Sequence, residues 1–459
     1  MSALWTAAEM QSATLGEMPR AFDATGLSID TRTLRPGDIF VALRGDARDG
    51  HEFVARALEA KASGALVSRR PEGAAGAPLL TVANTLRGLE DLARAARARS
   101  RAKIVAVTGS AGKTTTKEML RLAFGALGRT HASAASYNNH WGVPLSLASM
   151  PRDAEYGVFE TGMNHFGELR ALAAFVRPHV ALVTTIAPAH LEFFGSCEAI
   201  ADAKSEIFEG VLPGGAALVP SDSPHAGRLV ARARQAGVSR IMSFGARGEA
   251  RLIARHDTGD GMKIDAEICG VTTSFRIAAA GAHIANNALG ALLAVAATDG
   301  DVLNAAAALH AFTPLKGRGA RFTLALAGGS AELVDESYNA NPASMAAALA
   351  VLGAAAARRR IAVLGDMLEM GPEGAAHHAA LARDVEAARV DLVFASGPQM
   401  RALWEALPAA RRGAWGETSA AIAPEVAAAL APGDVVLVKG SNGMRMNVIV
   451  DALKARAGG

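Results

Sequence analysis

One short loop constrains the fold of this 459-residue chain more than any other feature. The run Thr108-Gly109-Ser110-Ala111-Gly112-Lys113-Thr114-Thr115 follows an apolar strand predicted over 103–107 and opens a helix predicted through Met119 and Leu120. Gly109 and Gly112 permit the tight turn in which backbone N–H groups and a helix N-terminus cradle phosphate. A strand, a glycine loop and a helix in this order predict a parallel sheet covered by helices.

The loop residues predict a nucleotide site. Lys113 is expected to reach the β- and γ-phosphates, and Thr114 is expected to offer its hydroxyl to Mg²⁺. Ser110, Ala111 and Thr115 complete the predicted ATP-binding loop. The strict pattern has Gly where Val107 stands, so this is a shortened variant. The alternative is a glycine turn that binds no ligand.

The rest of the chain predicts an α/β protein of three domains. A small N-terminal α/β domain is expected over residues 1–101, and a central domain with a mostly parallel sheet over 102–313. Polar–apolar alternation over 251–277 predicts an antiparallel addition to the central sheet. Strands alternate with helices again over 314–459, which predicts a Rossmann-like, doubly wound C-terminal domain.

Composition excludes several classes of protein. Half of the residues are apolar and a fifth are charged, which is typical of a globular chain with ample core. Lys plus Arg number 47 against 44 Asp plus Glu, with no basic run beyond 358–360, so no nucleic-acid partner is expected. Cys197 and Cys269 have neither disulfide-framework nor metal-ligand spacing. With no signal peptide and no membrane-spanning run, we expect a cytoplasmic protein without membrane insertion.

Three positions beyond the loop suggest chemistry. Glu160 follows a strand predicted at 157–159, where a carboxylate of an α/β sheet points into the ligand crevice and can coordinate Mg²⁺. His190 follows a strand predicted at 180–185, and Lys204 lies on a helix predicted over 199–208. Taken singly, each has a plainer interpretation, namely an exposed loop carboxylate, a surface histidine and a surface lysine.

Considered together, these segments resemble a known family. The chain contains, in this order, the phosphate loop, Glu160-Thr161-Gly162, Pro188-Ala189-His190, Lys204-x-x-x-Phe208 and Gly281-x-His283-x-x-x-Asn287-Ala288. This order resembles the ATP-dependent Mur ligases over essentially the whole chain. Three later segments are similar to one branch of that family: Asp335-Glu336-Ser337-Tyr338-Asn339-Ala340-Asn341-Pro342, Leu364-Gly365-Asp366-Met367-x-Glu369-Met370-Gly371 and Val438-Lys439-Gly440-Ser441.

The resemblance implies an ATP-dependent carboxylate–amine ligase of peptidoglycan precursor synthesis. It would join D-alanyl-D-alanine to the terminal carboxylate of UDP-N-acetylmuramoyl-tripeptide through an acyl phosphate, releasing ADP and phosphate. Matching positions imply catalytic roles for Lys113, Glu160, His190 and Lys204. Thr114, Glu160, His190 and Lys204 would hold Mg²⁺. Lys204 matches a lysine that is carbamylated in relatives, which turns a cation into an anion able to bind metal.

Further contacts are implied by the same resemblance, together with a monomeric state. Asn287, Arg318 and Asp335 would contact the nucleotide, although Ile284 stands where many relatives carry Asn. Asn341 precedes Pro342 and is also a predicted helix N-cap. The implied substrate residues are Ser28, Asp30, Thr31, Arg32, Asp49, Gly50 and His51 in a uridine-nucleotide-binding domain, then Asn138, Asn139, Tyr338, Asn339, Asn341, Lys439 and Ser441.

Three other functions compete with this interpretation. A different Mur-type or folylpolyglutamate-type amide ligase would share the phosphate loop, but the segments resembling the uridine-nucleotide domain and the run Tyr338-Asn339-Ala340-Asn341-Pro342 argue against it. A P-loop kinase or ATPase would not need the Lys204 site. A regulatory protein that has lost catalysis would have no reason to keep Lys113, Glu160, His190 and Lys204 together.

Overall fold

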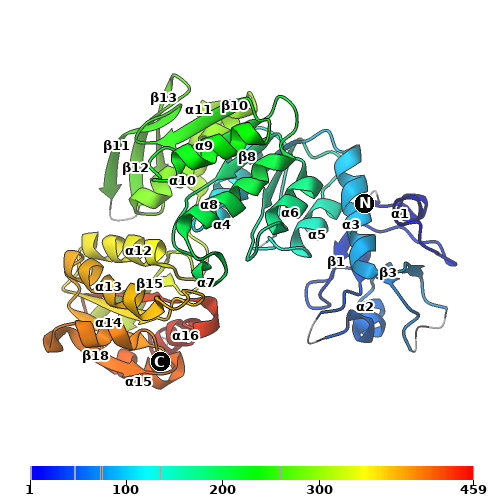
Figure 1. Ribbon diagram of the computed structural model, residues 1–459. Coiled ribbons are helices and arrows are strands. Elements are labelled where there is room, and N and C mark those ends of the chain that lie inside the picture. The colour runs from blue at the N-terminus through cyan, green and yellow to red at the C-terminus, as the bar shows by residue number, and fades with distance from the viewer. Residues whose placement is uncertain are drawn as a thin grey trace.

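Three sheets divide the structure into three lobes that follow one another along the chain (Figure 1). The computed structural model describes residues 3–45, 48–72, 74, 76–134, 136–258 and 261–457. The α/β class is confirmed, with a small N-terminal unit, a mostly parallel central sheet and a doubly wound C-terminal sheet. The boundaries predicted at 101/102 and 313/314 fall in connections between elements. Residues 1, 2, 458 and 459 lie outside the described residues.

The N-terminal lobe is a parallel sheet of order β1-β2-β3-β4. Helix α3 packs against α5 of the central lobe, and the Trp5 indole donates to the Ala148 carbonyl at 2.9 Å. The Arg97 guanidinium donates to the Val176 carbonyl at 2.8 Å, so this lobe is anchored through buried polar contacts. The elements are α1 (Ala7–Thr14), β1 (Gly26–Ser28), β2 (Asp38–Val41), η1 (Gly50–Phe53), α2 (Val54–Glu59), β3 (Gly64–Val67), β4 (Leu79–Thr81) and α3 (Thr85–Arg99).

The central lobe is a nine-stranded sheet of order β13-β12-β11-β10-β9-β8-β5-β7-β6. Its strands run parallel from β6 to β11, and β12 and β13 add the antiparallel edge that the sequence predicted. Helices α4 and α10 cover one face with an apolar core, and α5, α6, α8 and α9 cover the other. Because β5 lies between β7 and β8, the phosphate loop opens between the carboxyl ends of these two strands.

The bounds of the central elements are β5 (Lys103–Thr108), α4 (Lys113–Gly125), β6 (Thr130–Ala132), α5 (Gly142–Ala148), β7 (Tyr156–Glu160), α6 (Glu168–Val176), β8 (Val180–Val183), α7 (Leu191–Phe194), α8 (Cys197–Ser205), η2 (Glu206–Gly210), β9 (Ala216–Pro220), α9 (Ala226–Gln235), β10 (Arg240–Gly245), β11 (Ala250–Thr258), β12 (Gly261–Ile268), β13 (Val271–Ile277), α10 (Ala282–Ala297), α11 (Val302–Ala308) and η3 (Leu309–Ala311). The helix predicted over 199–208 ends earlier, at Ser205, and continues as the 3₁₀ turn η2. The strand predicted over 180–185 ends at Val183.

The C-terminal lobe is a six-stranded sheet of order β14-β15-β19-β16-β17-β18, parallel except for the β14–β15 hairpin. Helices α12 and α13 pack on one face, and α15 and α16 on the other, as in a doubly wound sheet. The elements are β14 (Ala320–Leu326), β15 (Gly329–Glu336), α12 (Pro342–Ala354), β16 (Arg359–Gly365), α13 (Gly374–Ala387), β17 (Leu392–Ser396), α14 (Arg401–Ala406), η4 (Ala409–Arg411), β18 (Arg412–Gly416), α15 (Ser419–Ala429), β19 (Asp434–Lys439), η5 (Asn442–Met444) and α16 (Asn447–Ala457).

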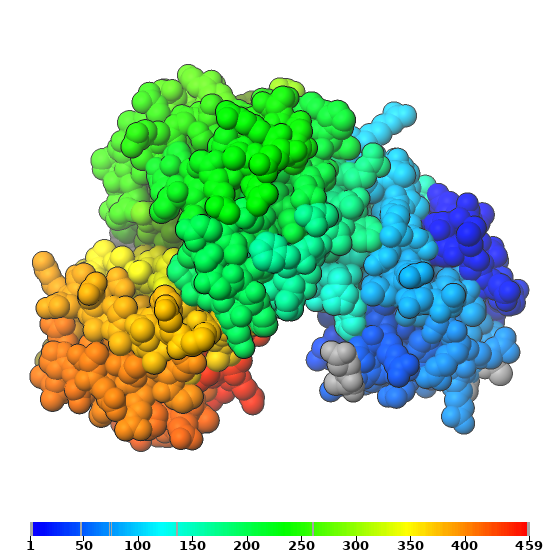
Figure 2. Space-filling model, in the orientation of Figure 1, coloured from blue at the N-terminus to red at the C-terminus, as the bar shows by residue number. Residues whose placement is uncertain are grey.

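The outer lobes flank a hollow below the central lobe. Figure 2 shows the N-terminal lobe in blue and the C-terminal lobe in orange, separated by open space under the green central lobe. A substrate that contacted both outer lobes would have to cross this hollow. Among the described residues, no helix combines the length and the apolar character needed to cross a membrane.

Candidate functional site

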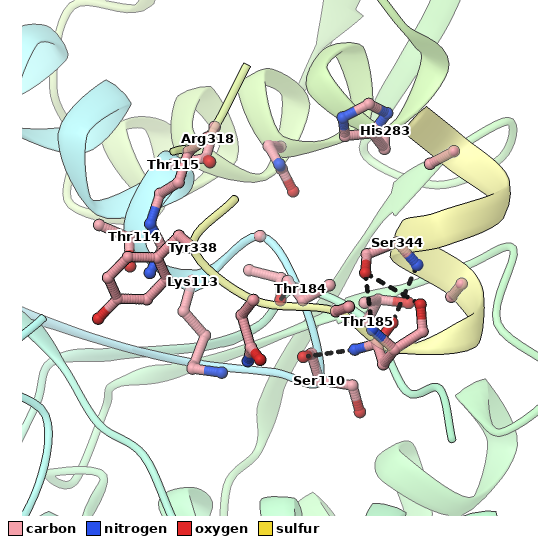
Figure 3. Close-up of a pocket in the computed structure, with 18 of the residues that line it drawn as sticks. Ser110, Lys113, Thr114, Thr115, Thr184, Thr185, His283, Arg318, Tyr338 and Ser344 are labelled. Atoms are coloured by element: carbon pink, nitrogen blue, oxygen red, sulfur yellow. Dashed lines mark hydrogen bonds between the residues drawn. The ribbon is translucent and has the colours of Figure 1, made fainter. Parts of the chain in front are cut away.

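A cavity of about 580 Å³ lies between the central and C-terminal lobes. The phosphate loop forms its floor, and the first turns of α10 and α12 face each other across it (Figure 3). Most of the site residues predicted for these two lobes come together here. Those that line the cavity are Ser110, Ala111, Gly112, Lys113, Thr114, Thr115, Asn138, Glu160, His190, Asn287, Arg318, Tyr338, Asn339, Asn341 and Lys439.

The phosphate loop is held open by the end of β8. Gly112 is the N-cap of α4 with φ of 81°, a backbone conformation that glycine adopts without strain. The Thr184 hydroxyl donates to the Ala111 carbonyl at 2.5 Å, and the Ser110 hydroxyl donates to the Ala187 carbonyl at 2.9 Å. The N-terminus of α4 therefore faces the cavity, as anion binding requires.

Lys113 spans the loop. Its ammonium donates to the Gly109 carbonyl at 2.7 Å. Burial lowers the pKa of Lys113, the Glu160 carboxylate opposes this shift, and the Arg318 guanidinium adds to it. An incoming polyphosphate would supply the negative charge that this pair of cations lacks.

Glu160 ends β7 directly opposite Val107 of β5. It is only 1% exposed, and its Oε1 accepts a hydrogen bond of 2.7 Å from the Asn138 amide. Its buried Oε2 has no hydrogen-bond partner in the protein. The Thr114 hydroxyl, on the first turn of α4, also lines the cavity. An orphaned carboxylate oxygen near a hydroxyl and a phosphate-binding loop fits a hard cation that takes oxygen ligands.

His190 and Lys204 both belong to the central lobe, and the charge of Lys204 acts on His190. His190 follows β8 in a left-handed conformation, with φ of 58°, and hydrogen-bonds through Nδ1 to Glu369 of the C-terminal lobe. Burial lowers the pKa of His190, the Glu369 carboxylate opposes that shift, and Lys204 and Lys113 reinforce it. In the described part of the chain, no three His, Cys, Asp or Glu side chains gather as a ready-made metal cluster. Any cation here would therefore draw further ligands from bound phosphates.

Lys204 is a buried lysine next to another lysine. Only 2% of it is exposed, and no carboxylate of the described residues lies within ion-pair distance. Burial, reinforced by the charge of Lys113, holds the pKa of Lys204 well below its usual range. Its side chain is thus driven toward the neutral amine, which is a nucleophile rather than a cation.

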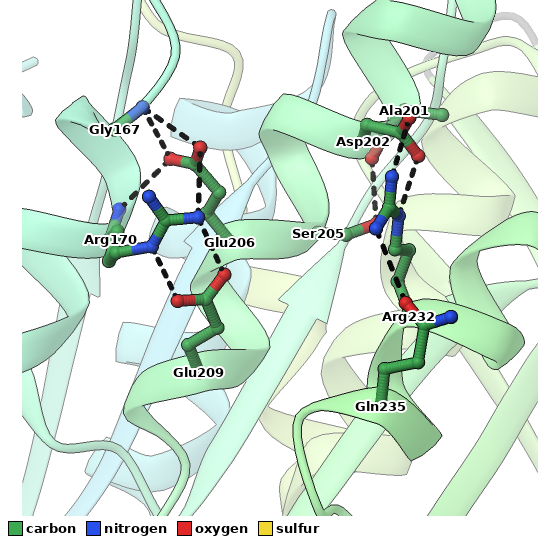
Figure 4. A network of polar contacts seen from close by, with 9 residues as sticks. All are labelled: Gly167, Arg170, Ala201, Asp202, Ser205, Glu206, Glu209, Arg232 and Gln235. Carbon is green, nitrogen blue, oxygen red and sulfur yellow. Dashed lines mark hydrogen bonds and ion pairs between the residues drawn. The ribbon is translucent and has the colours of Figure 1, made fainter.

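A polar network fixes the helix that carries Lys204 (Figure 4). The Glu206 carboxylate is 5% exposed and accepts from the backbone N–H groups of Gly167 at 2.8 Å and Arg170 at 3.2 Å. These groups begin helix α6, so Glu206 caps that helix from the neighbouring segment. Because the loop before Gly167 starts at Glu160, the two segments that present Glu160 and Lys204 are tied together.

The C-terminal lobe reaches the loop through Arg318 and Asn341. The Arg318 guanidinium stacks over the Tyr338 ring, 4.0 Å from its centroid, and donates to the Ser136 hydroxyl at 3.2 Å. Asn341 is the N-cap of α12, as predicted, with a capping box to Ser344. Its amide Nδ2 also donates to the Ser110 carbonyl at 3.2 Å, so the structural role and the contact with the phosphate loop coexist.

Some predicted site residues lie elsewhere or are already engaged. Asp335 is fully buried, and its carboxylate accepts from Gly317, at 3.0 Å, and from Ser337. The Ser441 hydroxyl accepts from the Leu368 backbone, and Lys439 donates to the Asn339 carbonyl at 2.9 Å while lining the cavity. Roles of Asp335 and Ser441 in binding ligands stay predictions. Gly109 and Asn139 are next in sequence to lining residues without lining the cavity themselves, and Lys204 does not line it either.

The predicted uridine-site residues form a separate group in the N-terminal lobe. Asp30 pairs with Arg32, and Asp49 accepts from His51 Nδ1 at 2.6 Å while the Ser68 backbone donates to His51 Nε2. The other members are Ser28 at the end of β1, Thr31 after it, and Gly50 at the start of η1. None of them lines the central cavity, so their role in binding a nucleotide stays a prediction.

Sequence reasoning did not select several residues that shape the cavity. Thr184, Ser136 and Glu336 line it, and Glu369 contacts His190. Glu336 and Glu369 lie inside segments that carry the family resemblance. The available sequence signal for these two residues was therefore a carboxylate within a recognised motif. No motif indicated Thr184 or Ser136, because their side chains support the fold of the phosphate loop.

Comparison with known proteins agrees with this architecture. Three family models match in the order of the lobes: "Mur ligase family, catalytic domain" over 23–97, "Mur ligase middle domain" over 107–295 and "Mur ligase, glutamate ligase domain" over 320–442. The chain belongs to the Mur ligase family. It is 34% identical to the UDP-N-acetylmuramoyl-tripeptide–D-alanyl-D-alanine ligase of Escherichia coli, over 93% of both chains.

Two solved structures extend the comparison. MurF from Acinetobacter baumannii is 31% identical, with a TM-score of 0.86 over 98% of this chain and 99% of that one. MurF from Thermotoga maritima, solved in complex with ADP, has a TM-score of 0.78 over 94% of this chain and 98% of that one. At 23% identity, the second match speaks for the fold alone.

The tight packing of Gly109 gives a first test. A Cβ at this residue would overlap the Thr184 hydroxyl, and its φ of 152° disfavours other residues. Gly109→Ala should weaken binding of a fluorescent ATP analogue by roughly tenfold or more, because the loop must distort. Gly125→Ala is the matched control, since no atom lies within 4 Å of its Cβ position. Equal affinities for the two variants would contradict this account of the loop.

The Glu206 cap gives a second test. Glu206→Ala removes the acceptor of two backbone N–H groups and should lower the free energy of unfolding by about 2 kcal/mol or more. Glu209→Ala, on the next turn, loses only an exposed ion pair with Arg170 and should change stability far less. Urea unfolding followed by circular dichroism measures both. A larger loss for Glu209→Ala than for Glu206→Ala would refute the capping role.

Proposed function

We propose that this protein is the ATP-dependent ligase that joins D-alanyl-D-alanine to UDP-N-acetylmuramoyl-tripeptide in the synthesis of peptidoglycan precursors. The observation that carries the proposal is the match to such ligases over nearly the full length of both chains, N-terminal lobe included. The phosphate loop at the interface of two lobes supports it independently. A kinase or ATPase of another family would not share all three lobes.

The chemistry follows from what a carboxylate needs. A carboxylate is a poor electrophile, and transfer of the γ-phosphoryl group of ATP makes one of its oxygens a leaving group. The amine of D-alanyl-D-alanine then attacks the acyl phosphate, and the tetrahedral intermediate expels phosphate. Lys113, Arg318 and the N-terminus of α4 are suited to bring two anions together at the loop. Asn138 orients Glu160 through the bond to Oε1.

The same residues fit divalent cations. Thr114 and the orphaned Oε2 of Glu160 are the proposed ligands of a first Mg²⁺, and His190 of a second. Bound Mg²⁺ would neutralise the charge on the transferred phosphoryl group. ATP contacts by Asn287 fit its position, because the Asn287 amide lies against Gly112 of the loop.

Lys204 is proposed to be carbamylated. Its amine is buried and held toward the neutral form, which is the form that attacks CO₂. The new N–C bond converts the amine to a carbamate with loss of a proton, so a cation becomes an anion. That change would replace repulsion between Lys204 and Lys113 with attraction, and it would give a second Mg²⁺ an oxygen ligand.

The N-terminal lobe is proposed to hold the uridine nucleotide, so that the peptide of this substrate extends across the hollow to the cavity. Asn138, Asn139, Tyr338 and Asn339 lie on the segments that this peptide or the incoming dipeptide would meet. A cytoplasmic location and a monomeric state are part of the proposal, because ATP and nucleotide-linked precursors are found in the cytoplasm.

The dependence on substrates tests the function directly. Phosphate release from ATP and Mg²⁺ should require both UDP-N-acetylmuramoyl-tripeptide and D-alanyl-D-alanine, and mass spectrometry should detect the pentapeptide product. Each substrate withheld in turn is the control. Phosphate release without the dipeptide would favour an ATPase or kinase, and no release with either lysine- or diaminopimelate-containing tripeptide would favour a different amide ligase.

Chemical rescue tests the carbamate. Lys204→Ala should lose at least about 100-fold in turnover, and a small carboxylic acid such as formate should restore part of it by supplying the missing oxygens. Lys113→Ala should also be inactive, but formate should not restore it because the missing group is a cation. Full activity of Lys204→Ala without formate would remove the carbamate from the mechanism.

A further inference from the structure

A contact between two lobes lies at one edge of the cavity. His190 of the central lobe hydrogen-bonds through Nδ1 to the Oε2 atom of Glu369, which follows β16 in the C-terminal lobe. The Glu192 backbone N–H donates to the Glu369 carbonyl at 3.1 Å. Between them, Leu191 packs against the apolar cores of both lobes. Two loops from different lobes thus meet at three consecutive residues.

Both partners of the side-chain bond are held in an uncommon backbone conformation. His190 has φ of 58° and Glu369 has φ of 62°, in the left-handed region that residues with a Cβ rarely occupy. The bond is not a buried structural contact, since the His190 and Glu369 side chains are 25% and 39% exposed. Conformations of this kind persist where surrounding contacts enforce them, and they gather at functional sites.

The bond determines which ring nitrogen is available. A carboxylate that accepts from Nδ1–H stabilises that tautomer and leaves the lone pair of Nε2 free to bind a cation. His190 lines the cavity, and the positive charges of Lys113 and Lys204 act on it. The C-terminal lobe therefore orients the His190 ring for a cation that the central lobe mainly binds.

We propose that Glu369 is a positioning residue, through which the docked C-terminal lobe orients His190 for cation binding. The cation site at His190 is then complete only while the two lobes are in contact. This inference rests on the proposed function for the role of His190 as a cation ligand. It adds that the carboxylate that hydrogen-bonds to His190 comes from the C-terminal lobe, whereas the phosphate loop belongs to the central lobe.

Other contacts between the two lobes do not involve Glu369. Asn341 donates to Ser110 and Arg318 to Ser136, and both bonds should remain when the Glu369 side chain is removed. Glu369→Ala should therefore leave the lobes able to meet while the imidazole loses its orienting partner. Glu369→Gln keeps an oxygen that can accept from Nδ1–H, and it should recover part of what alanine loses.

The test measures Mn²⁺ binding by electron paramagnetic resonance, with a non-hydrolysable ATP analogue and UDP-N-acetylmuramoyl-tripeptide present. Glu369→Ala should weaken one class of Mn²⁺ site by about tenfold or more, the usual effect of losing a carboxylate behind a ligating histidine. Glu369→Gln should fall between alanine and the unaltered chain. Glu373→Gln, which alters an exposed carboxylate at the start of α13, is the matched control and should bind Mn²⁺ normally.

A double-mutant cycle separates positioning from general damage. His190→Ala should weaken the same class of site, and adding Glu369→Ala should then change nothing further. An equal additional loss in the His190→Ala background would overturn the proposal, as would normal Mn²⁺ binding by Glu369→Ala or by His190→Ala. Product formation by the unaltered chain is measured separately, so a chain that binds Mn²⁺ but forms no amide would refute the proposed function and not the role of Glu369.

Discussion

The candidate site depends on the parallel pairing of β5 with β7 on one side and β8 on the other. In this register, Glu160 ends its strand opposite Val107, and Thr108 lies opposite Val183. Parallel strands place their carboxyl ends on one edge, so the phosphate loop, Glu160 and His190 meet there although up to 82 positions separate them in the sequence. The contacts of Thr184 and Ser110 then hold the loop in the shape that this edge allows.

Unbalanced positive charge is the second constraint on the site. Lys113 and Arg318 line the cavity, and the charge of Lys113 also acts on the buried Lys204. The negative group that acts on Lys113 is the Glu160 carboxylate. Burial and the charge of Lys113 both lower the pKa of Lys204, which weakens its positive charge relative to that of an exposed lysine. Nucleotide and carboxylate substrates, both anions, would weaken the repulsion between these cations further. Binding of these anionic ligands would therefore also balance the positive charge of the site.

The sequence predicted those features of the site that depend on residues close together in the chain. The glycine loop, the carboxylate at the end of β7 and the N-cap at Asn341 each follow from local rules, and the structure has all three features. The ends of elements were predicted less accurately, as the helix expected over 199–208 ends at Ser205 and the strand expected over 180–185 ends at Val183, because an apolar pattern does not determine where regular backbone hydrogen bonding stops. The bond between His190 and Glu369 spans 179 residues and two lobes. Only the packing of the lobes reveals it, since neither residue has a local signature for the other.

The way in which the lobes meet bears on turnover. Near the cavity, contacts across this interface include hydrogen bonds from Asn341 and Arg318, the bonds of His190 and Glu192 to Glu369, and the apolar side chain of Leu191. Polar interfaces of this kind separate more readily than apolar ones, so we expect the C-terminal lobe to move away from the central lobe and return in each cycle. An acyl phosphate must be kept from water until the amine arrives. Because these contacts converge on the loop and on His190, the site is assembled when the two lobes are in contact, and we expect product release to follow when the lobes separate.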